Sequence, residues 1–299
     1  MAADPDAKSF ADVARRLRRQ VDEALVRYTE YGDDCPVKLA QAIRHSLLAP
    51  AKRLRPMLVL MSCQACGCDP RAALPAACAV EMVHTYSLIH DDLPAMDDDD
   101  MRRGQPSCHA KFGEATAILA GDALLAQAFE ILATDIQPPT VAARCCRELA
   151  LAAGASNLVG GQQDDLTAEH ERGGIEQLEK IHRRKTGAMI GVSLRLGGIL
   201  GGASNTELAG LDIYGANLGL AFQIVDDLLD LGGDATKLGK RTGKDSTHGK
   251  LTFPAVLSVE GSRQRARQLI DEAKAALAIF GSRAAALESL ADYVIERDH

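Results

Sequence analysis

Apolar residues recur with a helical period along almost the whole 299-residue chain, and this pattern constrains the fold more than any other feature. From Ala11 to Tyr28, for example, Val13, Leu17, Val21 and Leu25 share one face of a helix. Further helices are predicted at about 36–48, 54–66, 71–93, 114–133, 139–158, 174–202, 205–231, 252–280 and 283–297. No segment shows the alternation typical of a β-strand. The sequence therefore predicts a single all-α domain over residues 1–299.

The composition agrees with helix packing and excludes several classes of protein. Hydrophobic residues make up 46% of the chain but aromatic residues only 4%, so Ala, Leu, Val and Ile must build the core. A net charge of −7 argues against nucleic-acid binding. No run of about 18 apolar residues is present, which predicts no membrane-spanning helix. Asp4 and Asp6 occupy the place where a signal peptide needs apolar residues. We expect a soluble, cytoplasmic protein.

The eight cysteines raise the question of a zinc site. Without an export signal, disulfide bonds are not expected. Cys63, Cys66, Cys68 and Cys78 could be arranged around zinc, but a second properly spaced pair is missing and Cys78 lies in an apolar helical run. Free thiols are therefore the favoured interpretation.

Two polar segments interrupt the helical pattern, and each follows an apolar helix that ends in paired aspartates. The first segment runs from Leu93 to Ser107 and the second from Gly232 to Lys250. The aspartates are Asp91, Asp92 and Asp97 in the first cluster and Asp226, Asp227 and Asp230 in the second. A solvated acidic loop would explain one such cluster, but the same arrangement occurs twice with basic residues following each time. The chemistry of the protein is expected at these two places.

Carboxylates at the C-terminal end of a helix need a counter-charge, because the helix dipole and their mutual repulsion both disfavour them. Two unit charges 4 Å apart repel by about 4 kcal/mol at an effective dielectric near 20. Asp226 and Asp230 share a helical face, whereas Asp91 and Asp97 would diverge by about 120° on a straight helix. Since Pro94 disfavours helical geometry before it, we predict a bulge that returns Asp97 to Asp91. Aspartates, Mg²⁺ and basic residues together indicate a diphosphate clamp.

At these residues the chain resembles the isoprenoid (polyprenyl) diphosphate synthases, and among them the bacterial short-chain farnesyl diphosphate synthases. The family motif DDxxxxD matches Asp91 to Asp97, and DDxxD matches Asp226 to Asp230. Further collinear matches are Lys52-Arg53-Leu54-Arg55-Pro56, His84, Arg102-Arg103-Gly104, Gly161-Gln162 with Asp165, Lys185-Thr186-Gly187, Gln223, Lys240 and Gly249-Lys250. One departure is Ala51, where the family usually has Gly; a slight change of backbone is expected there.

The resemblance implies the isoprenoid synthase fold, a bundle of roughly ten or more helices around a central cavity. It implies a magnesium-dependent prenyltransferase that condenses isopentenyl diphosphate with dimethylallyl and geranyl diphosphate to give farnesyl diphosphate and pyrophosphate, typically as a homodimer. Alternatives are a geranyl, geranylgeranyl or longer-chain synthase, a class I terpene cyclase, or a non-catalytic subunit that retains the fold. The intact second motif, with Lys240 and Lys250, argues against a cyclase, and the presence of both motifs argues against a non-catalytic subunit.

The resemblance also implies a role for each matched residue. Asp91, Asp97 and Asp226 correspond to direct ligands of roughly three Mg²⁺ ions, supported by Asp92, Asp227 and Asp230. Lys52, Arg55, His84 and Arg103 correspond to the pocket for the isopentenyl diphosphate head group. Arg102, Lys185 and Lys250 correspond to contacts with the allylic diphosphate, over which Lys240 closes. Thr186, Gln223 and the carbonyl of Lys185 correspond to groups along the allylic cation. Arg53 is expected to be a solvated arginine.

Product length is expected to depend on Tyr86. This residue lies five positions before Asp91, about 7.5 Å deeper along the helix axis, while Ser87 points more nearly along the face of Asp91. From the helix alone, Tyr86 could equally pack between helices. The resemblance implies that a bulky side chain at this position closes the floor of the pocket, which favours a C15 product over C20.

Overall fold

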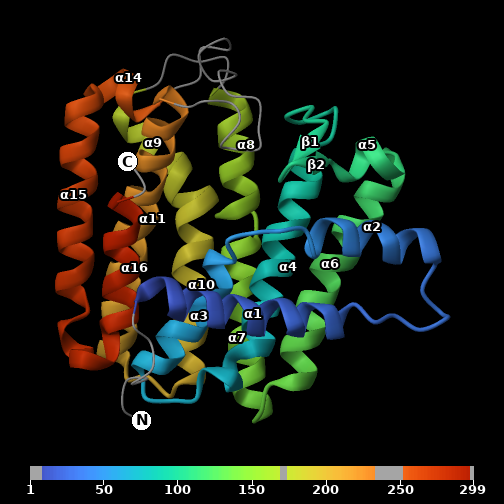
Figure 1. Cartoon of the computed structure of the whole chain (residues 1–299), viewed down its shortest axis with the longest axis horizontal. Helices are drawn as coiled ribbons and strands as arrows, with labels where there is room; N and C mark the ends of the chain where they lie inside the picture. The colour runs from blue at the N-terminus through green and yellow to red at the C-terminus, as the bar shows by residue number, and fades with distance from the viewer. Residues whose placement is uncertain (1–8, 169–173, 233–251, 297–299) are drawn as a thin grey trace.

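The computed structural model describes residues 9–168, 174–232 and 252–296, and helices dominate these residues (Figure 1). In chain order they are α1 (Phe10–Tyr28), α2 (Val37–Leu47), α3 (Leu54–Ala65), η1 (Pro70–Ala73), α4 (Leu74–Asp91), α5 (Cys108–Phe112), α6 (Glu114–Asp135), α7 (Pro139–Ala153), α8 (Leu158–Ala168), α9 (Ile175–His182), η2 (Arg183–Gly187), α10 (Ala188–Leu200), α11 (Asn205–Gly232), α14 (Phe253–Leu257), α15 (Val259–Ala276), η3 (Ala278–Ala284) and α16 (Ala285–Glu296). The predicted all-α class is confirmed.

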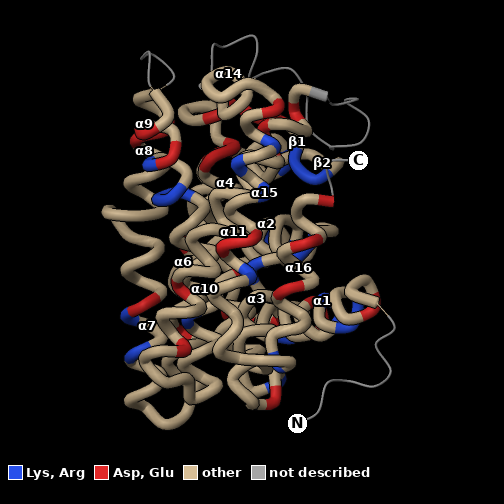
Figure 2. Tube along the Cα trace, turned by 90° about the vertical axis from the view of Figure 1, so that its left-hand side faces the viewer, with Lys and Arg blue, Asp and Glu red and all other residues tan. Residues whose placement is uncertain are grey.

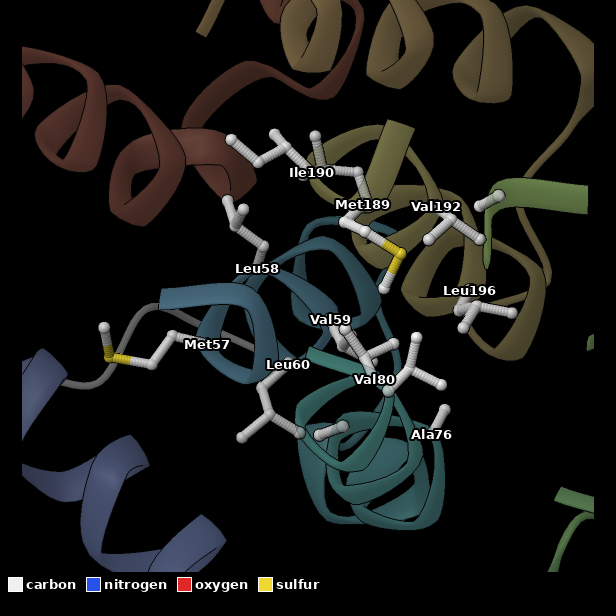
Figure 3. Close-up of a cluster of buried hydrophobic side chains, with 14 of the residues drawn as sticks. Met57, Leu58, Val59, Leu60, Ala76, Val80, Met189, Ile190, Val192 and Leu196 are labelled. Carbon is white, nitrogen blue, oxygen red and sulfur yellow. The ribbon is translucent and has the colours of Figure 1, made fainter. Parts of the chain in front are cut away.

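The core of the bundle is the seam where α3 packs between α4 and α10 (Figure 3). The buried side chains of this seam are Met57, Leu58, Val59 and Leu60 from α3, Ala76 and Val80 from α4, and Met189, Ile190, Val192 and Leu196 from α10. Gly197 allows α3 and α10 to approach closely, because a Cβ there would overlap the carbonyl oxygen of Val59 and the hydroxyl of Ser62. The aromatic-poor composition thus produces tight contacts between helix backbones.

The boundaries of several elements differ from those predicted. The segment predicted as one helix at 139–158 divides into α7 and the start of α8, and the segment 252–280 breaks at Ser258, whose φ of 67° is left-handed. An antiparallel hairpin joins β1 (Met101–Arg102) to β2 (Gln105–Pro106), with Arg102 opposite Gln105. Strands of two residues are too short to show alternation, so the sequence analysis did not predict them.

Three helical segments are long and apolar enough, by length and composition, to cross a membrane: Pro70–Asp91, Glu114–Asp135 and Asn205–Leu231. This differs from the expectation that no segment would qualify, because mean hydropathy tolerates an occasional polar residue that an uninterrupted apolar run does not. Within the bundle, 67%, 39% and 56% of their apolar windows are buried. The middle value shows that α6 is the least buried of the three, and its exposed large apolar side chains are Ile118 and Leu119.

The charged residues of the two aspartate clusters lie at one end of this bundle. In Figure 1, the β1–β2 hairpin and α14 both lie at the top. The hairpin contacts the C-terminal end of α4 through Arg102 and Asp92, and α14 contacts the end of α11 through Phe253 and Asp227. Acidic and basic segments lie next to each other beside β1 (Figure 2). The helices therefore bring both clusters to the same end of the molecule.

Candidate active site

The C-terminal end of α4 places the first aspartate cluster. Asp91 is the last residue of the helix, and the chain then turns back on itself. The backbone N–H of Asp97 donates to the carbonyl oxygen of Asp91 at 2.8 Å, and that of Asp99 donates to Asp92 at 3.2 Å. The predicted bulge around Pro94 is therefore confirmed: the loop returns Asp97 to the side of Asp91.

Asp91 lies in surroundings that favour a nearby cation. Its side chain is buried, with the residue 9% exposed. Burial raises the pKa of this carboxyl to about 6, Lys185 opposes the rise, and the charges of Asp97 and Asp92 add to it. Crowded carboxylates at a helix C-terminus are costly without a counter-charge. The donor set consists of hard oxygens, so these residues fit Mg²⁺.

The second cluster lies at the end of α11 and is more open. Asp226 and Asp227 are half-buried and Asp230 is exposed. Asp227 accepts a hydrogen bond from the N–H of Phe253 at 2.8 Å, while the charge of Asp226 reaches Arg55 on α3 and favours its protonated form. Within residues 9–168, 174–232 and 252–296, no three His, Cys, Asp or Glu side chains form a ready metal site.

A wide helical turn, η2, aligns the third side of the site. Lys185 donates to Asp165 at 2.8 Å, and Arg184 donates to Asp164 at 2.6 Å. Gly161 on α8 makes this approach possible, because a Cβ there would lie 2.5 Å from the backbone nitrogen of Lys185. Since η2 is π-helical, its turn contains about one more residue than a turn of the flanking α-helices α9 and α10.

The next residue of η2 connects this turn to the second cluster. The Thr186 hydroxyl donates to the side-chain oxygen of Gln223 on α11. The amide atoms of Gln162 on α8 are buried and have no hydrogen-bond partner among the described residues. Lys185 is also close enough to Asp91 to counter the rise in the pKa of that carboxyl. The site thus joins α4, α8, η2 and α11.

Four arginines, Arg53, Arg55, Arg102 and Arg103, lie close enough to His84 on α4 to influence its charge. Arg55 on α3 lies 3.2 Å from the Nε2 atom of His84. Arg102 makes a bidentate contact with Asp92, which is the kind of pairing that a guanidinium fork favours. Arg103 lies 3.8 Å from Glu81.

Arg53, in contrast to the expectation of a solvated side chain, is only 3% exposed. It donates to Glu81 at 2.7 Å and to Asp22 at 2.8 Å. Burial forces this pairing, because an isolated buried guanidinium would be very unfavourable.

These four arginines fall into two electrostatic classes. Burial opposes the charge of Arg53 and of Arg102, but their carboxylate partners outweigh it and raise the pKa of each guanidinium. Burial and neighbouring cations lower the pKa of Arg55 and of Arg103. The Nε atom of Arg55 is buried without a hydrogen-bond partner among the described residues. Of the four arginines, Arg55 and Arg103 are therefore the two whose positive charge a bound anion would stabilise most.

The protonation state of His84 depends on this excess of positive charge. Burial, followed by the charges of Arg55 and the other three arginines, holds the pKa of His84 well below its usual range. Its imidazole is consequently neutral and can donate or accept a hydrogen bond without adding charge.

The remaining predicted residues are placed as follows. Lys52 is exposed immediately before Arg53. Tyr86 is 7% exposed, and its ring lies edge-on to His90 with centroids 5.7 Å apart. Ser87 is half-buried and donates to the carbonyl of His84 at 2.9 Å. Lys240 and Lys250 lie outside the described residues.

Sequence reasoning missed Glu81 and misjudged Arg53. Glu81 is 1% exposed and lies among apolar residues of α4. A single charge within an apolar helical segment was the available signal, since such a residue must either break the segment or find a buried partner. Lys52-Arg53-Leu54-Arg55 offered no way to tell which basic side chain turns inward.

Comparisons with known proteins agree with this geometry. The polyprenyl synthetase family profile matches residues 36–283. The farnesyl diphosphate synthase of Geobacillus stearothermophilus is 46% identical over 286 residues, which cover 94% of this chain and 96% of that protein. A heterodimeric geranylgeranyl pyrophosphate synthase large subunit of Arabidopsis thaliana is 46% identical over 272 residues, covering 88% and 73%.

Solved structures give the same result at the level of the fold. An FPP/GFPP synthase from Zymomonas mobilis superimposes with a TM-score of 0.87 at 37% identity, covering 96% of this chain and 98% of that one. Aspartates at two helix ends, opposed by arginines and a lysine, thus occur in a chain whose sequence and fold agree along nearly their full length with one group of enzymes. The chain belongs to the polyprenyl synthetase family of prenyltransferases, which condense isopentenyl diphosphate with allylic diphosphates.

Proposed function

We propose that this chain is a magnesium-dependent farnesyl diphosphate synthase whose two substrates bind on either side of the C-terminal end of α4. The observation that carries the proposal is that an acidic and a basic side chain of this region, Asp91 and Arg55, are both incompletely neutralised. Asp91 is a buried carboxylate with a raised pKa, and Arg55 has a buried Nε atom with no hydrogen-bond partner among the described residues. An allylic diphosphate with Mg²⁺ would satisfy the first, and the homoallylic diphosphate would satisfy the second.

Asp91, Asp97 and Asp226 would hold Mg²⁺, with Asp92, Asp227 and Asp230 in support. When bound, Mg²⁺ would neutralise charge on the departing pyrophosphate. Lys185 and Arg102, with Lys250 and Lys240, would bind the same allylic diphosphate. Lys52, Arg55, His84 and Arg103 would bind isopentenyl diphosphate, for which the neutral His84 supplies a hydrogen bond rather than a further charge.

The reaction would proceed in three bond changes. The allylic C–O bond breaks, and its electron pair leaves with pyrophosphate. The double bond of isopentenyl diphosphate then forms a C–C bond to the allylic cation. Loss of a proton, which the pyrophosphate oxygen accepts, restores a double bond. Gln223 and Thr186 would direct their oxygens along the developing cation.

The direct test is turnover with purified protein. We expect pyrophosphate release from isopentenyl and dimethylallyl diphosphate together, abolished by a chelator and restored by Mg²⁺. Release from the allylic substrate alone would instead support a cyclase. The absence of any turnover under saturating conditions would favour a non-catalytic subunit and contradict the proposal.

Tyr86 supports farnesyl diphosphate as the product. Its buried ring and edge-on contact with His90 fix a bulky group one and a half turns below Asp91. Tyr86→Ala should open that position and shift the product toward geranylgeranyl diphosphate, while Ser87→Ala should change product length less. Chromatography of dephosphorylated products decides between them. An unchanged C15 profile in an active Tyr86→Ala protein would assign length control to another residue.

A soluble, cytoplasmic homodimer with one domain per chain is the form we propose for the enzyme. Most of the apolar window that includes α4 is buried inside the bundle, whereas Ile118 and Leu119 on α6 are 44% and 57% exposed. An exposed apolar helix face is typical of a surface that another chain covers. Sedimentation of the wild type and of an Ile118→Lys variant would test this: a wild-type monomer would contradict it.

A further inference from the structure

Glu81 is a buried charge on α4 that the proposed reaction does not use. It lies ten residues before Asp91, is 1% exposed, and contacts two arginines through one oxygen, Oε1. Arg53 donates to it at 2.7 Å and Arg103 lies 3.8 Å away. A buried carboxylate is costly unless it is paired, so the pairing is a feature of the fold rather than a chance surface contact.

Arg53 connects Glu81 to the backbone that carries Lys52 and Arg55. Its guanidinium also donates to the carbonyls of Leu47 at 2.8 Å and Ala49 at 3.2 Å. Its φ of 52° is left-handed, at the residue immediately before α3. A non-glycine residue holds such a conformation only when its surroundings fix it. The Glu81–Arg53 pair therefore fixes the turn from which Lys52 and Arg55 project.

The same carboxylate counters the positive charge around His84. Arg103 approaches the pair directly, and the charge of Glu81 also favours the protonated forms of Arg55 and Arg103 against their burial. One negative charge thus serves three arginines, of which only Arg53 bonds it closely. A bound anion would further stabilise the positive charges of Arg55 and Arg103.

We propose that Glu81 is a positioning residue for the homoallylic diphosphate: it orients Arg103 directly and the Lys52–Arg55 turn through Arg53. The proposal rests on the proposed function, because it presumes that Arg55 and Arg103 bind isopentenyl diphosphate. Glu81 does not touch substrate. Its effect should therefore appear in the binding of one substrate and not in the chemical step.

Glu81→Gln tests this by removing the charge while keeping the shape. We expect KM for isopentenyl diphosphate to rise about tenfold, corresponding to about 1.4 kcal/mol, with kcat and the allylic KM within about twofold. Glu81→Asp, which keeps the charge, should restore part of the binding. Unchanged KM for isopentenyl diphosphate, or an equal rise for both substrates, would overturn the proposal.

The matched control is Glu148→Gln on α7. Glu148 also contacts two arginines, Arg195 at 2.9 Å and Arg147 at 3.7 Å, but lies outside the site. Its loss should lower Tm without changing either KM. If Glu148→Gln raised KM for isopentenyl diphosphate as much as Glu81→Gln, general loosening of the fold would explain both results and the proposal would fail.

Two further variants keep the test decisive. If Glu81→Gln does not fold because Arg53 lacks its partner, the double variant Glu81→Gln with Arg53→Met removes both charges. It should fold and still show the raised KM; a wild-type KM in the folded double variant overturns the proposal.

Arg55→Met separates the positioning role of Glu81 from the assignment of the pocket. If Arg55→Met raises KM for isopentenyl diphosphate and Glu81→Gln does not, the positioning role alone fails; if neither does, the pocket assignment itself is wrong.

Discussion

The α3–α10 seam and the charged end of α4 belong to one bundle but differ in how completely their groups are satisfied. In the seam, apolar side chains are fully buried and Gly197 lets the backbones touch. At the charged end, Asp91 is buried beside two further aspartates, and Arg55 keeps an unpaired Nε among the described residues. Apolar burial stabilises the fold, whereas uncompensated buried charge opposes it. Substitutions in the two regions should therefore separate activity from stability.

The largest effect is expected at the two aspartates proposed to bind Mg²⁺ directly at the two helix ends. Asp91→Asn and Asp226→Asn should each lower turnover by about 10²–10³-fold or more, because each removes a charged oxygen from the proposed Mg²⁺ site. Without Mg²⁺, Asp226→Asn should keep the Tm of the wild type, and Asp91→Asn should raise it, since a neutral amide is easier to bury than a carboxylate. Steady-state kinetics at saturating Mg²⁺ and thermal unfolding measure the two quantities. Turnover within a few-fold of wild type would break the contrast between the regions.

Asp92 should affect stability more than Asp230, because its carboxylate is buried and holds the side chain of Arg102. Asp92→Asn leaves Arg102, 14% exposed at its side chain, without its bidentate carboxylate, and should cost about 3 kcal/mol of unfolding free energy. Asp230→Asn, at the exposed end of α11, is the control and should change stability far less. Urea unfolding without Mg²⁺ measures both. Equal losses would mean that the Arg102 contact is not what distinguishes the first cluster.

In the seam, one methyl group should be enough to lower stability. Gly197→Ala should cost about 2 kcal/mol, because its Cβ would press against the backbone of α3. Gly191→Ala on the same helix meets open space, so it should instead stabilise by about 0.5–1 kcal/mol. Thermal unfolding of both proteins checks this, and kcat should be retained. The comparison is contradicted if both alanines change stability in the same direction.

At pH 7 the smallest effect is expected at His84, whose contribution to stability appears only as the pH falls. Burial and four arginines depress its folded pKa, so the unfolded chain binds a proton near pH 6.5 that the native protein does not bind. Stability is therefore full above about pH 6.5 and falls below it, by up to about 1.4 kcal/mol per pH unit. In His84→Gln this contribution should be missing. The difference between the two unfolding curves from pH 7 to 5 isolates it; parallel curves would show that His84 is protonated in the fold.

The sequence predicted the local backbone around the aspartates well where chain geometry alone controls position. The six-residue spacing of Asp91 and Asp97, with Pro94 between them, required the loop to turn back, and it does. The end of α11 was similarly clear, because four-residue spacing places Asp226 and Asp230 on one face. Local rules sufficed in both cases because the groups concerned are close together in the chain.

Prediction failed where position depends on contacts between distant elements. Arg53 was expected in solvent, but its burial depends on Asp22, Glu81 and the end of α2. The π-helical turn at Lys185 does not alter the hydrophobic periodicity, which predicts one continuous helix over 174–202. Ser258 breaks a helix whose sequence pattern continues. Lys240 and Lys250 stay predictions because they lie outside the described residues.

The π-turn of η2 has a consequence for how the gene could change. A π-helical turn holds about one more residue than an α-helical turn, and in this chain the wider turn is confined to Arg183–Gly187. Deleting one codon between Arg183 and Gly187 would close the turn to ordinary α-helix, and α10 would keep its phase against α3. Lys185 and Thr186, by contrast, would rotate relative to Asp165 and Gln223. A one-residue deletion at this position would therefore change the geometry of the catalytic end and leave the packing of the core unchanged.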